Sequence, residues 1–237
     1  MENESDVSSE SESQLVLSAL EARVLGSLME KEATTPDVYP LSLNSLVNAC
    51  NQKNNRNPVM AVDDEQALAA IELLRDKHLL TLFSGANSRA IKYRHKFAEV
   101  WPVEPAAQAF LCDLMLRGPQ TAAGLRGNCE RLAAVPDLAG AEELLADLAA
   151  RPGGALVQKL PRQPGQKEAR WTALIVEGAT ELANSTAEGG TDSGASRAPV
   201  TVAMKLPEEA EARIAALEAE VKALREELSE LRESLGG

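Results

Sequence analysis

Lysine and arginine residues are concentrated in two short stretches of this chain, and each stretch has the sequence pattern of a β-hairpin. Such side chains neutralise phosphates, and clusters of them are the usual means of holding a nucleic-acid backbone. The candidate phosphate contacts are Arg89, Lys92, Arg94 and Lys96 in the first stretch, Lys159, Arg162, Lys167 and Arg170 in the second, and Lys53 and Arg56 in an Asn- and Gln-rich loop. A second explanation stays open, because charged hairpins also keep sheet edges soluble and unpaired.

Sequence patterns for catalysis or metal binding are absent. The two histidines, His78 and His95, have no Cys, Asp, Glu or His partner at a helical or hairpin metal-binding spacing. The chain contains no G-x-G-x-x-G, G-x-x-x-x-G-K-[ST], H-E-x-x-H or G-x-S-x-G motif. We therefore expect a protein that is not an enzyme and that uses no metal or cofactor, with both histidines in structural roles.

The acidic charge of the chain lies at its two ends. Of the formal charge of −12 over 237 residues, −5 falls in residues 1–17 and −7 in residues 177–237, which leaves the middle nearly neutral. The acidic total therefore does not exclude a nucleic-acid partner.

Cysteine usage and the N-terminal residues bear on location. Cys50, Cys112 and Cys129 form an odd set without a C-x-x-C pair, which favours reduced core thiols over disulfides or a zinc site. The first residues are acidic and Ser-rich, unlike a signal peptide, and no run approaches the ~18 apolar residues of a membrane span. We expect a cytoplasmic protein that does not associate with membranes.

The first basic stretch follows three predicted helices. Ser18 and Glu21 form a capping box for a helix that runs to about Glu32. A short amphipathic helix contains residues 43–50, and Asp63 or Asp64 caps a third helix. Two strands, at about 79–83 and 90–96, then form a hairpin around a Gly/Asn turn. Alternation along the second strand predicts a buried face and a solvent face, with Ile91, Tyr93 and His95 on the first and Lys92, Arg94 and Lys96 on the second.

The same order recurs in residues 99–176. Thr121 opens a second helix, Asp137 introduces a third, and strands at 155–160 and 169–174 flank the second basic loop. The pattern predicts a mainly α fold with small β-hairpins, an α+β arrangement of two tandem winged-helix domains at residues 15–98 and 99–176.

The remaining segments are predicted from composition and period. Residues 1–14 form an acidic terminus and residues 177–206 a Gly/Ser/Thr-rich linker, and both are expected to be disordered. Residues 207–236 form a coiled-coil helix, because apolar side chains alternate spacings of three and four. The predicted dimerisation seam consists of Ile214, Leu217, Val221, Leu224, Leu228, Leu231 and Leu235.

A parallel homodimer is the favoured use of this seam. β-branched residues at the early a positions with Leu at d favour parallel dimers. The g-to-e' pairs are all attractive, namely Arg213 with Glu218, Glu220 with Arg225, and Glu227 with Arg232. The alternative is that the helix folds back onto its own domain.

Three segments of the sequence carry a family resemblance. They are Leu20–Lys31, Tyr39–Asn44 and Ala49–Met60, the last reading ACNQKNNRNPVM. In these segments the chain resembles the YceH family, an uncharacterised bacterial group with tandem winged-helix domains, from about residue 15 to 176. The resemblance implies the fold expected above and brings no activity, ligand or catalytic residue.

Two functions remain in competition. DNA association is favoured by the doubled fold and the basic hairpins, but the third helices carry carboxylates that would meet phosphates. Those acids are Asp63, Asp64, Glu65, Glu72 and Asp76 in the first copy and Asp137, Glu142, Glu143 and Asp147 in the second. We therefore expect salt-sensitive backbone contacts with weak sequence selectivity, made by hairpins and loop. The alternative is a dimeric protein-interaction scaffold that does not bind DNA.

Overall fold

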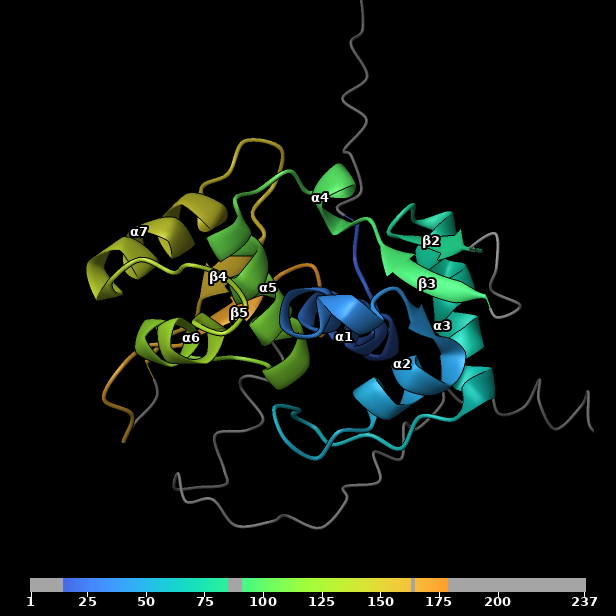
Figure 1. Cartoon of the computed structure of the whole chain (residues 1–237). Coiled ribbons are helices and arrows are strands. Elements are labelled where there is room, and N and C mark those ends of the chain that lie inside the picture. Colours follow the sequence, from blue (N-terminus) through green and yellow to red (C-terminus); the bar gives the residue numbers. More distant parts are fainter. Residues whose placement is uncertain (1–14, 85–90, 163–164, 179–237) are drawn as a thin grey trace, which may run out of the picture. The chain divides into compact units, whose positions relative to one another are not determined.

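The computed structural model describes residues 15–84, 91–162 and 165–178 (Figure 1). In its first half, residues 15–98, three α-helices precede a hairpin. The elements are α1 (Ala19–Thr34), a 3-10 turn η1 (Pro36–Val38), β1 (Leu41–Ser42), α2 (Leu43–Cys50), α3 (Asp64–Asp76), β2 (Leu80–Phe83) and β3 (Lys92–His95). A four-residue helix, α4 (Phe97–Val100), leads into the second half.

The second half repeats this order. Its elements are α5 (Pro105–Arg117), α6 (Ala122–Cys129), α7 (Leu138–Ala149), β4 (Val157–Lys159) and β5 (Trp171–Ala173). Helices and small antiparallel sheets thus make up the described chain, which confirms the predicted mixture of α-helices with small β-hairpins.

Local capping sets where the helices begin, as predicted. Ser18 and Glu21 make the reciprocal hydrogen bonds of a capping box at α1, and Asp63 forms the same arrangement with Gln66 at α3. Thr121 caps α6, and Asp137 caps α7. Each cap satisfies amide groups that the first helical turn leaves unpaired.

The first sheet has three strands in the order β1-β3-β2, one more than the hairpin predicted. In the antiparallel register, Tyr93 lies between Leu41 of β1 and Leu82 of β2, while Lys92 lies between Ser42 and Phe83. β1 was missed because a two-residue strand has no periodicity to detect. The second sheet pairs β4 with β5, and Gln120, just before α6, bridges to Trp171 as β1 does to β3.

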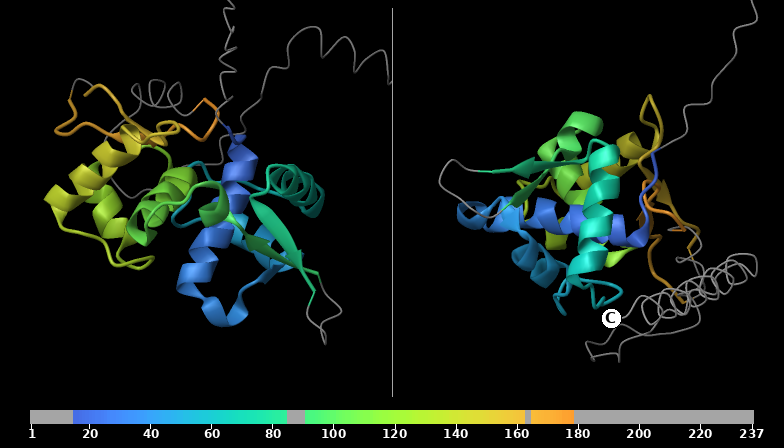
Figure 2. Two further views of the ribbon diagram at one scale, coloured as in Figure 1. Left: turned by 90° about the horizontal axis from the view of Figure 1, so that it is seen from above. Right: turned by 90° about the vertical axis from the view of Figure 1, so that its right-hand side faces the viewer.

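The hairpin of β2 and β3 extends beyond the helices (Figure 2). Tyr93 is buried as alternation predicts, but Ile91 on the same face is 54% exposed. This corrects the prediction that Ile91 faces the core. The reason is that the described helices reach only the part of the hairpin nearer to His95, so no helix of the described ranges packs against its outer end (Figure 2).

One apolar core runs through both halves. Residues 21–30 of α1 are all buried, because α1 packs against α2 and α3 on one side and against α5 on the other. The two long helices approach closely at Gly26, where an added Cβ would lie 3.0 Å from the Leu116 side chain. The two halves therefore share a core instead of folding as separate globules.

The ends of the described chain are tied together. The amide of Leu17 donates to the carbonyl of Ile175 at 2.8 Å, and the amide of Glu177 donates back to Leu17 at 2.8 Å. Among the described residues, no helix is both long enough and apolar enough to cross a membrane.

Candidate nucleic-acid interface

The β4–β5 hairpin and its connecting loop present an uncompensated positive surface. Lys159, Arg162, Lys167 and Arg170 are all exposed. None of them forms an ion pair with another described residue, and Glu168 is the one acid between them in the sequence. The Lys159 ammonium lies 5.4 Å from the centre of the Trp171 ring, a cation-π contact that fixes its stem. Four exposed cations without an ion-pair partner among the described residues therefore stand on one hairpin.

The β2–β3 hairpin carries a weaker version of the same surface. Arg94 is exposed and Lys92 is half-buried, as alternation predicts for the solvent face. Lys96 is partly neutralised, because its ammonium lies 2.6 Å from a Glu99 carboxylate oxygen. The prediction for Arg89 falls outside the described residues.

The two phosphate contacts predicted in the loop that follows α2 differ in their exposure. Lys53 is exposed, but the Arg56 side chain is buried. Arg56 donates to the Ala49 carbonyl from Nε (3.2 Å) and from Nη2 (2.9 Å), and its Nη2 lies 2.7 Å from Glu30 Oε2. This corrects the prediction that Arg56 contacts phosphate, since its donors are used inside the protein.

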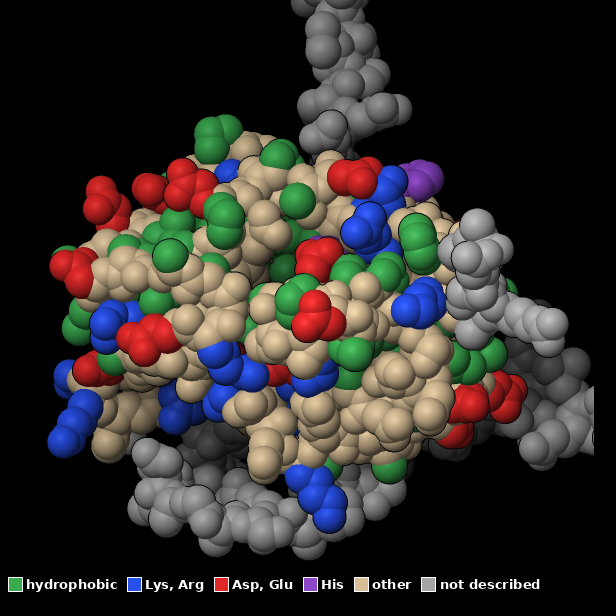
Figure 3. All heavy atoms as spheres, in the orientation of Figure 1, with side chains coloured by type: hydrophobic (Ala, Val, Ile, Leu, Met, Phe, Trp, Pro, Cys, Tyr) green, Lys and Arg blue, Asp and Glu red, His purple; other side chains and the backbone are tan. Residues whose placement is uncertain are grey.

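The third helix of each half is acidic on its exposed side. On α3 the exposed residues include Asp64, Glu65 and Glu72, and on α7 they include Glu142 and Glu143. Figure 3 shows acidic side chains gathered over α7. A carboxylate face repels phosphates, so these helices are poorly suited to the major groove.

Glu30 lies at the centre of a cluster of charged side chains between the two halves, which we call the joint. Its carboxylate is 1% exposed and meets Arg56 of the first half and Arg131 of the second, at 2.7 Å and 2.5 Å. Burial alone would raise the pKa of Glu30, but Arg56, Arg131 and Lys31 outweigh it and lower the pKa to about 2. The joint therefore requires Glu30 as an anion.

The loop after α2 also docks on the end of α5. The Asn57 amide donates to the Leu116 carbonyl at 2.9 Å, and the Arg117 guanidinium donates to the Asn55 side chain. Arg117 in turn pairs with buried Asp113 at 3.0 Å. The loop after α2, which carries much of the family resemblance, thus links the two halves.

Arg23 ties this loop to α1 from the inside. It is 1% exposed and donates to the carbonyls of Cys50 at 3.1 Å and Pro58 at 2.6 Å. Burial, reinforced by the charge of Arg56, lowers the pKa of Arg23 to about 10. Sequence reasoning missed this joint, although Arg23, Ser27 and Glu30 form a polar stripe at helical spacing along α1.

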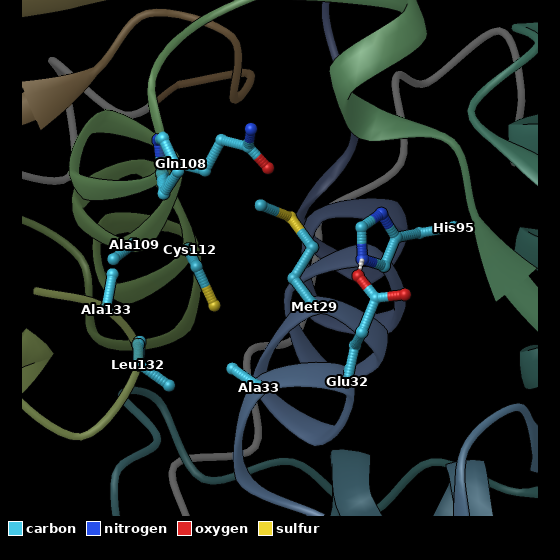
Figure 4. Close-up of a pocket in the computed structure, with 10 residues that line it drawn as sticks. Met29, Glu32, Ala33, His95, Gln108, Ala109, Cys112, Leu132 and Ala133 are labelled. Atoms are coloured by element: carbon cyan, nitrogen blue, oxygen red, sulfur yellow. Dashed lines mark ion pairs between the residues drawn. The ribbon is translucent and has the colours of Figure 1, made fainter. Parts of the chain in front are cut away.

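A small cavity of about 160 Å³ lies where α1, β3 and α5 meet (Figure 4). Its walls are largely apolar, and its polar groups come from Glu32, His95, Gln108 and Cys112. Nε2 of His95 faces a Glu32 carboxylate oxygen at a distance of 2.8 Å (Figure 4). The contact with His95 lowers the pKa of Glu32 against the opposing effect of burial.

Further hydrogen bonds, made by Nδ1 and the backbone amide of His95, fix its orientation. Nδ1 accepts a hydrogen bond from the Phe97 amide at 3.3 Å, and the His95 amide donates to the Tyr39 hydroxyl at 2.9 Å. Glu32 is thus a partner that sequence spacing could not show, and the pair ties β3 to α1. Elsewhere in the described ranges, as here, no three His, Cys, Asp or Glu side chains come together as a metal site.

The three cysteines are free thiols in the core. Cys112 donates to the Gly26 carbonyl and Cys129 to the Ala109 carbonyl. Burial raises the pKa of all three thiols. The seam residues from Ile214 to Leu235 lie outside the described residues, so their pairing stays a prediction.

Comparison with known proteins agrees with the resemblance noted from the sequence. Residues 17–166 match a family described as "Protein of unknown function, DUF480". A UPF0502 protein of Citrifermentans bemidjiense is 54% identical over 159 residues, which cover 67% of this chain and 73% of that protein. Another from Dechloromonas aromatica is 43% identical over 202 residues, covering 85% of this chain and 89% of the relative. The chain therefore belongs to the DUF480 family of UPF0502 proteins, the uncharacterised bacterial group to which its YceH-like segments pointed.

Proposed function

We propose that this chain is a non-enzymatic, DNA-associated protein of two winged-helix modules, which contacts the phosphate backbone of duplex DNA through its basic hairpins. Each half has three helices followed by a two-stranded hairpin. That order is the one in which winged-helix domains place a helix-turn-helix before a wing. The fold analogy supplies a starting expectation, and the charges of this chain decide which parts would touch DNA.

The observation that carries the proposal is the β4–β5 hairpin. Lys159, Arg162, Lys167 and Arg170 are exposed and form no ion pair with other described residues. By contrast, most charges near the joint between the halves are neutralised by partners, as Arg56 is by Glu30. A cluster of unneutralised cations is what releases counterions from DNA on binding.

The predicted mode of binding is non-specific contact with the backbone. α3 and α7 would bring Glu65, Glu72, Glu142 and Glu143 toward phosphates if either entered the major groove. Contacts by the hairpins avoid this repulsion but read little sequence, because phosphates are alike at every base pair. Binding is therefore expected to depend on salt and only weakly on sequence.

A parallel homodimer through the seam from Ile214 to Leu235 completes the proposal. A dimer presents each hairpin twice, so weak contacts reinforce one another through a high effective concentration. Reduced thiols at Cys50, Cys112 and Cys129 fit the expected cytoplasmic location.

The test is a pair of charge-matched variants of the full chain, titrated against labelled random duplex DNA at low salt. Arg162→Ala with Lys167→Ala removes two exposed charges from the second hairpin, and Arg75→Ala with Arg126→Ala removes two from α3 and α6. The hairpin variant is expected to bind about tenfold or more weakly, on the order of 1 kcal/mol per lost contact, and the helix variant to bind like the wild type. Equal losses in both, or no binding by the wild type, would reject contact through the hairpins.

A protein partner is the second candidate, and the outer faces of α3 and α7 favour it. These faces combine carboxylates with Leu68, Leu73 and Leu138, which are 41%, 50% and 45% exposed. A mixed acidic and apolar helix face suits a partner with basic and apolar side chains better than it suits DNA. Absence of DNA binding together with loss of a co-purifying protein on Leu73→Ser would favour this scaffold function.

A further inference from the structure

The outer face of the β1-β3-β2 sheet carries an aromatic residue and two cations. The register puts Phe83 of β2 opposite Lys92 of β3, with Ser42 of β1 on the other side of Lys92. In the next row on this face, Arg94 lies opposite Thr81. Residues that pair across neighbouring strands point to the same side of a sheet, so these five side chains share one face. We call them the outer sheet face.

Phe83 differs from the other two phenylalanines of this chain in its exposure. Aromatic residues make up 3% of the sequence, and only three of them are phenylalanine. Phe97 and Phe110 are fully buried, whereas Phe83 is 46% exposed. Leu82 and Ile91, at the same end of the hairpin, are also exposed, at 42% and 54%. Phe83 differs from them in offering a flat ring on the face that carries Lys92 and Arg94.

The charges around Phe83 indicate the chemistry of a ligand. Neither Lys92 nor Arg94 forms an ion pair with another described residue, unlike Lys96, which pairs with Glu99. The outer sheet face itself contains no carboxylate. Arg94 helps to lower the pKa of Glu32, but the ion-pair partner of Glu32 is His95. A ligand for this face should therefore offer a flat π-surface next to negative charge.

Unpaired nucleotides have that combination. Proteins that hold single strands use aromatic rings as platforms for bases and nearby cations for phosphates, on the open face of a sheet. In an intact duplex the base faces are covered by their neighbours, so a ring on a flat sheet cannot stack on them. We propose that the outer sheet face binds single-stranded nucleic acid, with a base stacked on Phe83 and the flanking phosphates held by Lys92 and Arg94.

This site rests on the proposed association with nucleic acid and lies on the β2–β3 hairpin, whereas the β4–β5 hairpin carries the main duplex contacts. Lys92 and Arg94 belong to both proposals, but Phe83 belongs to this one alone. Variants at Phe83 therefore test the platform, and Arg162→Ala with Lys167→Ala tests the duplex contacts. If the duplex contacts are wrong, binding to single strands survives; if the platform is wrong, duplex binding is unchanged by alterations at Phe83.

The experiment measures fluorescence anisotropy of a labelled oligothymidylate of about 12 nucleotides, a length within the usual range of single-strand sites, and of a matched duplex. Four full-length variants are compared: Phe83→Ala, Phe83→Tyr, Phe83→Leu and Leu82→Ala. Leu82 is the control, because it is similarly exposed, at 42%, but lies on the opposite face of the same strand. Thermal unfolding verifies that each variant folds.

Phe83→Ala and Phe83→Leu are expected to weaken oligothymidylate binding about tenfold, as loss of one stacked base does, while Phe83→Tyr and Leu82→Ala bind like the wild type. Duplex affinity is expected to be the same in all four. The proposal is overturned if the wild type does not bind oligothymidylate, if Phe83→Leu binds as well as Phe83→Tyr, or if duplex affinity falls in parallel. It is also overturned if an acidic peptide competes for the site as well as oligothymidylate does.

Discussion

Glu30 and Arg131 stand 101 positions apart in the sequence, yet the guanidinium of one donates to the carboxylate of the other at 2.5 Å. Arg56 occupies the second oxygen of the same carboxylate. One buried anion thus connects α1, the loop after α2 and the segment after α6. The Glu30–Arg56 pair is buried on both sides and is therefore protected from the salt screening that weakens surface pairs, whereas the Arg131 side chain is 38% exposed.

Replacing Glu30 should therefore destabilise the whole molecule. In Glu30→Gln, the buried Arg56 keeps its charge but loses its counterion, and such losses cost about 3–5 kcal/mol. Urea unfolding at pH 7 followed by circular dichroism measures the change. Glu65→Gln on the exposed side of α3 is the matched control and should unfold like the wild type. A Glu30→Gln protein as stable as that control would contradict the importance of the joint.

The stabilising effect of Glu30 should disappear in acid. The pKa of this group is about 2 in the folded protein and 4.5 without the fold, so the folded state favours the anion. A depressed carboxyl pKa contributes stability that is fully present above about pH 5 and is lost as pH falls toward 2. The stability difference between wild type and Glu30→Gln should shrink across that window. A difference that stays constant down to pH 3 would show that the charge of Glu30 is not what the protein uses.

The close approach of α1 and α5 makes Gly26 sensitive to added volume. A Cβ at this position would lie 3.0 Å from the Leu116 side chain and 3.5 Å from Met115. Gly26→Val should destabilise by about 1–3 kcal/mol, because a branched side chain must displace packed atoms. Adding Leu116→Ala should recover part of this loss by making room. The check is the urea midpoint of the two variants, and an unchanged midpoint for Gly26→Val would show that the helices separate easily.

The cysteines should be unreactive until the chain unfolds. Cys50, Cys112 and Cys129 are buried, and burial raises their thiol pKa values, so little thiolate forms at pH 8. A colorimetric thiol reagent should label almost none of them in the native protein and all three in denaturant. Rapid labelling of a native thiol would indicate that the core opens more often than its packing implies.

The features that sequence reasoning predicted correctly are local ones. Caps at Ser18 and Asp63 and the strand alternation that buries Tyr93 depend on residues a few positions apart, so short patterns reveal them. The joint depends on contacts between distant segments, and Arg56 looked like a surface cation because its partner Glu30 is 26 positions away. The polar stripe of Arg23, Ser27 and Glu30 on α1 was the sequence signal that could have indicated a buried partner for Arg56.

For the candidate interface, too, local features were predictable and features that depend on distant contacts were not. Exposure of Lys159, Arg162, Lys167 and Arg170 was foreseeable from the turn residues of the loop between their strands. The exposure of Phe83 was not foreseeable, because sequence alternation cannot tell which side of a short edge strand the helices will cover.

Salt dependence of duplex binding tests the central claim most directly. For the wild type, the logarithm of the association constant should fall linearly with the logarithm of salt concentration, and Arg162→Ala with Lys167→Ala should reduce the slope by about 0.9 for each phosphate contact removed. This result would place the second hairpin on the DNA backbone. A slope near zero, or the same slope in both proteins, would contradict it.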